Sequence, residues 1–171
     1  VAQTCLAGAE IHSIEGILNG TSNFILSRMR TDSMSYDDAL AEAQRLGIAE
    51  TNPTLDVEGF DTANKLALIA NVAMGADLLP EQVDRTGITG VSADEVRRTA
   101  AKGKIIRLVG RASMDERGEV RASVAPTHLS ADHPLASVDG SEKGITYTTD
   151  TMDRITVSGG KSDPLGAAAA L

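Results

Sequence analysis

The chain has 171 residues, of which 16 are basic and 24 acidic, so its net charge is -8 at pH 7. Aromatic residues make up only 2% and Trp is absent. A negative charge repels phosphate backbones and anionic lipid surfaces, and few aromatic side chains are available to stack on bases. The composition predicts a soluble globular protein of one or two domains that binds neither nucleic acid nor membranes.

The cysteine and histidine content excludes two further classes of protein. Cys5 is the only cysteine, so no disulfide can form within the chain. His12, His128 and His133 match no metal-ligand spacing, and we expect no metal site. No apolar run is long enough to cross a bilayer and no signal peptide is recognisable, which predicts a cytoplasmic protein.

Four helices are predicted in the first two thirds of the chain from capping residues and from apolar residues at helical spacing. Asn19 or Thr21 can cap the first helix, and Ser35 with Asp38 resembles a capping box at the start of the second. Gly47 closes the second helix. The predicted helices span residues 21–30, 35–46, 56–74 and 92–103.

Beyond the fourth helix the apolar period changes from helical to two, which indicates strands. An earlier strand is predicted over 11–19, a short one within 83–91, and a tight turn over 115–118. The later predicted strands span 104–114, 119–129, 144–150 and 154–160. Helices first and strands later predict an α+β fold, in which a mostly antiparallel or mixed sheet has helices packed on one face.

Ionisable residues crowd in the middle of the chain. Asp61 and Lys65 lie four residues apart, which makes them neighbours on a helix, but such a pair is common on solvated faces and stabilises a helix by only about 0.2–0.5 kcal/mol. Three acids precede the pair: Glu50, Asp56 and Glu58. Because like charges repel, such a cluster is tolerated best when a cation such as a substrate ammonium joins it, so the residues alone leave two alternatives open, a functional site and a solvated helix face.

The same segment resembles the signature of the homoserine dehydrogenase family. The positions that match at the family spacing are Ala43, Gly47, Ala49, Glu50, Asn52, Pro53, Asp56, Gly59, Asp61 and Lys65. Residues 16–26, 132–140 and 145–150 resemble further stretches of the family, so the likeness spans nearly the whole chain. Lys143-Gly144, where many bacterial members carry Asn-Ala, and Gly159-Gly160-Lys161 look most like the archaeal branch.

The resemblance implies an oxidoreductase that interconverts L-aspartate 4-semialdehyde and L-homoserine with NAD or NADP, in the biosynthesis of threonine, methionine and isoleucine. Residues 1–171 would form its substrate-binding and dimerisation domain. Hydride reduction of an aldehyde develops negative charge on oxygen, which needs a nearby cation or proton donor. Lys65 fits that role, and Asp61 one turn earlier would orient its ammonium.

Further positions are expected to bind the substrate. Glu50 and Asp56 resemble the family's contacts to the substrate ammonium and hydroxyl end. The backbone at Ile48 and Ala49 would line the same pocket, although Ile48 stands where the family often has Tyr. Thr21 resembles a residue near both substrate and cofactor, and a plain helix cap is the alternative.

The remaining candidates for cofactor contact are Gly159, Gly160 and Lys161. Glycines permit close approach of the backbone, and a lysine can meet a phosphate or a carboxamide. A tight turn with a solvated lysine is the alternative.

The dinucleotide-binding fingerprint G-x-G-x-x-G is absent from the sequence. Val1 is not an initiator Met, and the chain stops within an apparent helical run, so we expect an excised fragment that lacks an N-terminal nucleotide-binding domain. The resemblance implies that the missing region binds most of the cofactor and supplies a second active-site lysine and a monovalent-cation loop. The fragment alone is then expected to be inactive.

Two other readings stay open, a non-catalytic dimerisation or amino-acid-sensing module and another semialdehyde or iminium reductase. A scaffold would have no need of a lysine facing a cluster of acids, and the spacing from Asn52 to Asp61 is that of the homoserine dehydrogenase signature. The partners we expect are a small amino-acid substrate and a second copy of the chain, paired through exposed parts of the sheet.

Overall fold

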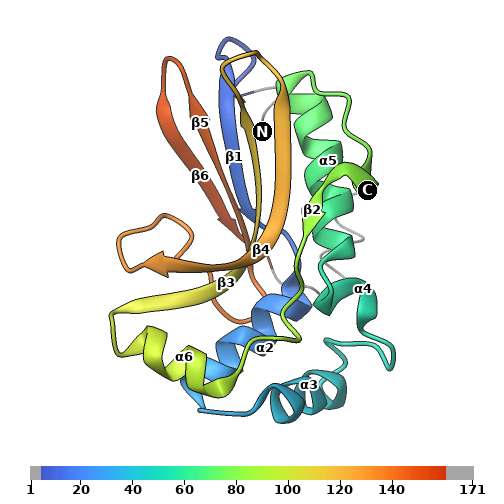
Figure 1. Ribbon diagram of the computed structural model, residues 1–171. Coiled ribbons are helices and arrows are strands. Elements are labelled where there is room, and N and C mark those ends of the chain that lie inside the picture. The colour runs from blue at the N-terminus through green and yellow to red at the C-terminus, as the bar shows by residue number, and fades with distance from the viewer. Residues whose placement is uncertain (1–4, 161–171) are drawn as a thin grey trace.

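The computed structural model describes residues 5–160, and its centre is a six-stranded sheet (Figure 1). The strand order is β2-β4-β3-β1-β5-β6, and all neighbours are antiparallel except β2 and β4, which are parallel. The strands are β1 Ile11–Ile17, β2 Asp84–Arg85, β3 Lys104–Met114, β4 Val120–Ser130, β5 Lys143–Thr149 and β6 Asp153–Gly159. The predicted α+β class with a mixed, mostly antiparallel sheet is confirmed.

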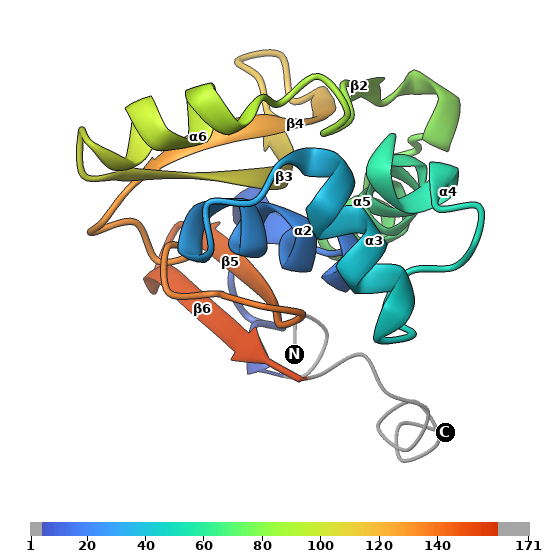
Figure 2. The same ribbon diagram turned by 90° about the horizontal axis from the view of Figure 1, so that it is seen from below.

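The helices cover one face and one end of this sheet. They are α2 Gly20–Thr31, α3 Tyr36–Arg45, α4 Thr54–Val57, α5 Phe60–Met74 and α6 Ala93–Ala100, with a 3-10 turn η1 at Pro80–Gln82. Figure 1 shows α5 lying along the sheet while α2, α3 and α6 gather beyond its lower end. Figure 2 shows α2 and α3 packed side by side at that end. No helix within residues 5–160 is long and apolar enough to span a membrane.

Cap residues fix the starts of the first helices. The Asn19 side-chain oxygen accepts a hydrogen bond from the Ser22 backbone N–H at 2.8 Å, so Asn19 is the N-cap of α2. Thr21 lies inside the first turn of this helix. The Ser35 hydroxyl oxygen accepts from the Asp38 backbone N–H at 3.1 Å and caps α3, as predicted.

The prediction of one continuous helix over 56–74 is wrong at its start. Two helices, α4 and α5, meet at Gly59, whose φ of +80° is left-handed and cannot continue a right-handed helix. The Glu58 carbonyl accepts instead from Arg85 Nη1 at 2.8 Å. The turn starts α5 in a new direction along the sheet and places Asp61 in its first turn.

The main apolar core lies between the sheet and the helices. Ile14 of β1, Leu66 of α5 and Leu108 of β3 are all nearly or fully buried in it. The helix α5 comes close to β3 at Gly110, where an added Cβ would lie 3.2 Å from Thr62 Cγ2. A smaller cluster fills the other side of the sheet with residues from the β4–β5 connection, and consists of Ile17, Val109, Leu129, Leu135 and Val138.

Gly87 lets the loop after β2 lie against the α4–α5 junction. A Cβ at this position would be 2.5 Å from the Val57 carbonyl oxygen and 2.6 Å from Glu58 Cα. Gly87→Ala should therefore lower the free energy of unfolding by about 1–3 kcal/mol, the usual cost of overpacking. Gly90→Ala is the matched control because its Cβ would meet nothing within 4 Å. Urea denaturation measures both variants, and equal losses of stability would contradict this account of the junction.

Candidate active site

Asp61 and Lys65 form the predicted ion pair on α5. Lys65 Nζ donates to Asp61 Oδ2 at 2.6 Å and to the Leu18 carbonyl oxygen at 3.4 Å. The Lys65 side chain is 45% exposed and that of Asp61 30% exposed. An ion pair this exposed contributes little to stability, typically about 0–1 kcal/mol. The second contact, to the backbone that follows β1, fixes the ammonium beyond what a surface pair requires.

Asn19 joins the pair to the acidic loop. Its buried side-chain N–H group donates to Asp56 Oδ1 at 2.6 Å and to Asp61 Oδ2 at 2.9 Å, while its oxygen caps α2 through Ser22. One amide therefore links three helices. The sequence predicts Asn19 only as a possible helix cap, although the residue lies in the stretch 16–26 that resembles the family.

A small acidic pocket of about 170 Å³ lies on one side of this network and is lined by Glu50, Asn52, Leu55, Asp56, Asp61 and Asn64. The structure thus brings together three of the predicted acids: Glu50 of the loop before α4, Asp56 of α4 and Asp61 of α5. The fourth acid does not belong to the pocket. The Glu58 side chain accepts from the Thr89 hydroxyl at 2.9 Å, and Gly87 packs beside it on the far side of the α4–α5 junction.

A larger cavity of about 730 Å³ is lined by Lys65 itself. Its polar edge contains Lys65, Lys143, Gly159 and Gly160, and its apolar wall consists of Leu18, Leu68, Ile69, Ile145 and Val157. The two glycines predicted to approach a cofactor therefore lie in the same cavity as the predicted catalytic lysine. Lys161 lies outside the described residues.

The sequence distinguishes Lys143 only as a difference from many bacterial members of the family, not as a site residue. It is the first residue of β5 and is paired with Gly159 of β6. Burial lowers the pKa of its ammonium, the charge of Lys65 lowers it further, and the carboxylate of Asp61 raises it. The charges of Lys143, Lys65 and Asp61 are therefore close enough to act on one another.

Thr21, Ile48 and Ala49 lie beside the site rather than in either cavity. The buried Thr21 hydroxyl donates to the Ile48 carbonyl oxygen at 3.0 Å and ties α2 to the loop that leads to Glu50. Ala49 is also buried. In this arrangement the Thr21 side chain holds the loop in place, and its predicted contacts to substrate and cofactor stay predictions.

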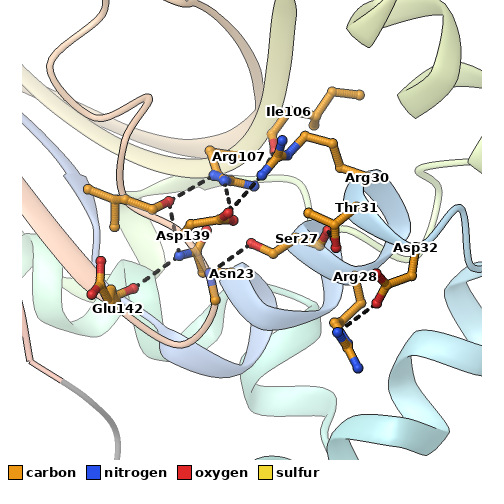
Figure 3. Close-up of polar contacts among 12 residues, drawn as sticks. Asn23, Ser27, Arg28, Arg30, Thr31, Asp32, Ile106, Arg107, Asp139 and Glu142 are labelled. Atoms are coloured by element: carbon orange, nitrogen blue, oxygen red, sulfur yellow. Dashed lines mark hydrogen bonds and ion pairs between the residues drawn. The ribbon is translucent and has the colours of Figure 1, made fainter.

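A polar network fixes the connection between β4 and β5 (Figure 3). Arg107 of β3 is completely buried, and its Nη2 donates to Asp139 Oδ1 at 2.8 Å, while Arg30 of α2 donates to the other oxygen at 2.7 Å. Asn23 of α2 donates to the Glu142 carbonyl oxygen at 3.1 Å. The chain is thereby held to α2 up to the residue before Lys143.

The carboxylate of Asp139 stays charged in this network. Burial raises its pKa, but a hydrogen bond from Ser27 and the charges of Arg107 and Arg30 outweigh that effect and hold the pKa below its ordinary value.

Within residues 5–160, no group of three or more His, Cys, Asp or Glu side chains is placed to hold a metal ion.

The sequence model of the family described as homoserine dehydrogenase matches residues 1–171. This chain belongs to the homoserine dehydrogenase family. The NAD(+)-dependent homoserine dehydrogenase of Pseudomonas canavaninivorans is 39% identical to it over 159 residues, which are 93% of this chain and 45% of the relative. The homoserine dehydrogenase of Methanocaldococcus jannaschii is 36% identical over 171 residues, which are 100% of this chain and 49% of the relative.

Solved structures agree with this assignment. A homoserine dehydrogenase from Thiobacillus denitrificans superposes with a TM-score of 0.94 at 36% identity, over 99% of this chain and 39% of that one. A hyperthermophilic archaeal homoserine dehydrogenase in complex with NADPH gives a TM-score of 0.73 at 30% identity, over 90% of this chain and 43% of that one. This chain therefore spans less than half the length of these relatives. Its sequence identity to the archaeal relatives is no higher than its identity to the bacterial ones, so these values do not assign it to the archaeal branch.

The amide of Asn19 should be needed for stability because it donates to two carboxylates, those of Asp56 and Asp61, and keeps them apart. In Asn19→Asp the cap to Ser22 can still form, but three carboxylates then face one another, and at least one must take a raised pKa in the folded state. The folded state then binds more protons than the unfolded state, so the lost stability should return as the pH falls.

We expect Asn19→Asp to lose about 1–3 kcal/mol of unfolding free energy at pH 7, with a smaller loss at pH 5. Urea denaturation at both pH values measures the effect. The matched control is Asn64→Asp, which adds the same charge at an exposed position of the acidic pocket. A loss that does not depend on pH, or one that Asn64→Asp reproduces, would contradict the bridging role.

Proposed function

We propose that this chain is the substrate-binding part of an enzyme that interconverts L-aspartate 4-semialdehyde and L-homoserine with a nicotinamide cofactor. The observation that carries the proposal is the position of the Lys65 ammonium. Its partner Asp61 lines the acidic pocket, while Lys65 itself lines the larger cavity, so the ion pair joins the two spaces. Membership of the homoserine dehydrogenase family supports the same reaction.

Lys65 would move the proton of the reaction. Reduction adds hydride to the aldehyde carbon, and the oxygen that gains the electron pair takes up a proton. A lysine ammonium has three N–H donors. In the described part of the chain, Asp61 Oδ2 and the Leu18 carbonyl accept two of them, which leaves the third for the substrate oxygen. In the reverse direction, the neutral amine accepts the proton of the homoserine hydroxyl.

The acidic pocket would hold the substrate ammonium. Glu50 and Asp56 line it together with Asp61, and an ammonium placed among them relieves their mutual repulsion. The Asn19 amide keeps Asp56 and Asp61 at fixed positions by donating to both. The substrate would then enter with its charged end at the acids and its reacting carbon toward Lys65.

The larger cavity fits the nicotinamide end of NAD or NADP. Its walls are mostly apolar, and at its edge Gly159 and Gly160, with φ of +121° and +72°, present backbone without a side chain. When bound, the cofactor supplies or accepts the hydride. One relative is named as NAD(+)-dependent and one solved neighbour is a complex with NADPH, so the proposal includes either cofactor.

We also propose that a segment outside this chain binds most of the cofactor and supplies the second active-site lysine. The absence of G-x-G-x-x-G and the greater length of the relatives support this. The enzyme would be cytoplasmic and dimeric. The edge strand β6, on which Val157 is 42% exposed, supports pairing of two copies through the sheet. The mass of the full-length gene product in solution tests this pairing.

Oxidation of homoserine by the full-length gene product tests the reaction itself. We expect NAD(+) or NADP(+) to be reduced in proportion to homoserine consumed, as followed by absorbance of the reduced nicotinamide. Binding of homoserine without turnover with either cofactor would contradict the proposal and favour an amino-acid-sensing module.

Replacement of Lys65 should slow the chemical step. Lys65→Met should lower kcat by about 10²–10⁴-fold, the usual contribution of a positioned proton donor, with a much smaller change in the KM for homoserine. Lys102→Met, which removes an exposed lysine after α6, is the matched control. A Lys65→Met enzyme that retains nearly normal kcat would show that another group moves the proton.

A further inference from the structure

We propose that Asn23 of α2 is a positioning residue for the larger cavity, because it holds the segment 138–142 that leads into β5. The Asn23 side chain lines neither the cavity nor the acidic pocket, so it acts through the backbone that it binds. This inference rests on the proposed function, in which the cavity holds the nicotinamide end of NAD or NADP. It adds the residue of α2 on which the shape of that cavity depends.

The start of β5 and the end of β6 form much of the cavity wall. Residues 143–145 of β5 line the cavity together with residues 157–160, and each of these β5 residues is paired with one residue of β6. A shift in the start of β5 would therefore move both strands along this wall. The position of Glu142, the last residue before β5, thus decides how much space is open to a nicotinamide ring.

Asn23 holds the segment 138–142 at both of its ends (Figure 3). Its side-chain N–H group donates to the Glu142 carbonyl oxygen at 3.1 Å and to the Val138 carbonyl oxygen at 3.4 Å. The side chain is completely buried. Removing it would leave both carbonyls with one donor fewer, in a place where solvent does not replace it.

Val138 carries this restraint directly to the cavity. A Cβ added at Gly144, which lines the cavity, would lie 2.7 Å from Val138 Cγ2, so the valine packs against the backbone of the second residue of β5. The Val138 carbonyl also accepts from Arg107 Nε at 3.1 Å. The amide of Asn23 therefore fixes both the backbone that enters β5 and the side chain that supports it.

The same helix connects the two cavities. Ser27, one turn after Asn23, accepts from the Gly140 backbone N–H at 3.1 Å, so both side chains are directed to the segment 138–142. At the start of the helix, Asn19 donates to the two carboxylates of the acidic site. We therefore expect α2 to position the acidic pocket through Asn19 and the larger cavity through Asn23.

Packing alone does not account for an amide at this position. The Asn23 side-chain oxygen is buried and has no hydrogen-bond partner within residues 5–160. An unpaired buried oxygen lowers stability, and an apolar side chain of similar volume, such as Leu, would avoid that loss. The N–H group of the amide, which makes both bonds to the segment, is the part that an apolar side chain could not supply.

The test compares cofactor binding with substrate binding. Calorimetry measures the Kd of NAD(+), of NADP(+) and of homoserine for the full-length gene product and for its Asn23→Ala variant. Asn23→Ala should weaken binding of the nucleotide that the wild type prefers by about 3- to 10-fold, the factor that corresponds to one hydrogen bond. It should weaken homoserine binding by less than about 2-fold, because Asn23 makes no contact with the acidic pocket.

Two further variants separate positioning from stability. Ile25→Val removes one methylene group from a fully buried core residue of the same helix, so it should lower thermal stability and change neither Kd. Ser27→Ala removes the acceptor of the Gly140 N–H and should weaken nucleotide binding by about 2- to 5-fold. If thermal denaturation shows that Asn23→Ala does not fold, Ser27→Ala carries the test.

Several outcomes would overturn the assignment. They are equal weakening of nucleotide and homoserine binding, unchanged nucleotide binding in a folded variant, and a loss of nucleotide binding that Ile25→Val reproduces. Failure of the proposed reaction looks different. Wild-type protein that binds homoserine and a nucleotide but transfers no hydride refutes the reaction, while the dependence of nucleotide binding on Asn23 still stands.

Discussion

The carboxylate of Asp61 accepts hydrogen bonds from both Lys65 and Asn19, and the arrangement of the site depends on this shared acceptor. Lys65 comes from the same helix, whereas Asn19 caps a different one and also holds Asp56. The carboxylate thus fixes where α5 begins relative to α2 and α4. If the start of α2, α4 or α5 were displaced, the Lys65 ammonium would move away from the acidic pocket and from the larger cavity.

The sheet contributes the other side of the site. Because β1 lies between β3 and β5, the residues that follow β1 meet the start of β5 and the end of β6 at one place. Leu18, Lys143 and Gly159 meet there, and the cavity opens between them and α5. The acidic pocket and this cavity are joined by the Asp61–Lys65 ion pair, because Asp61 lines the pocket and Lys65 lines the cavity.

Features of the structure that depend on residues close together in the sequence can be predicted from the sequence. Features that depend on contacts between distant parts of the chain cannot. The cap at Ser35 and the spacing of Asp61 and Lys65 are local, and the structure agrees with both. The turn at Gly59 depends on β2, which comes later in the chain and holds the Glu58 backbone through Arg85. No periodicity could indicate this. The position of Lys143 likewise depends on the register between β1 and β5, which are far apart in the sequence.

The most direct measurement is a crystal structure of the full-length gene product with homoserine and the oxidised cofactor. We expect the homoserine hydroxyl within about 2.6–3.2 Å of Lys65 Nζ, the distance that proton transfer requires. We also expect the substrate ammonium in the pocket of Glu50 and Asp56. A complex in which Lys65 turns to bulk solvent, or in which homoserine binds away from these acids, would contradict the proposed role of Lys65.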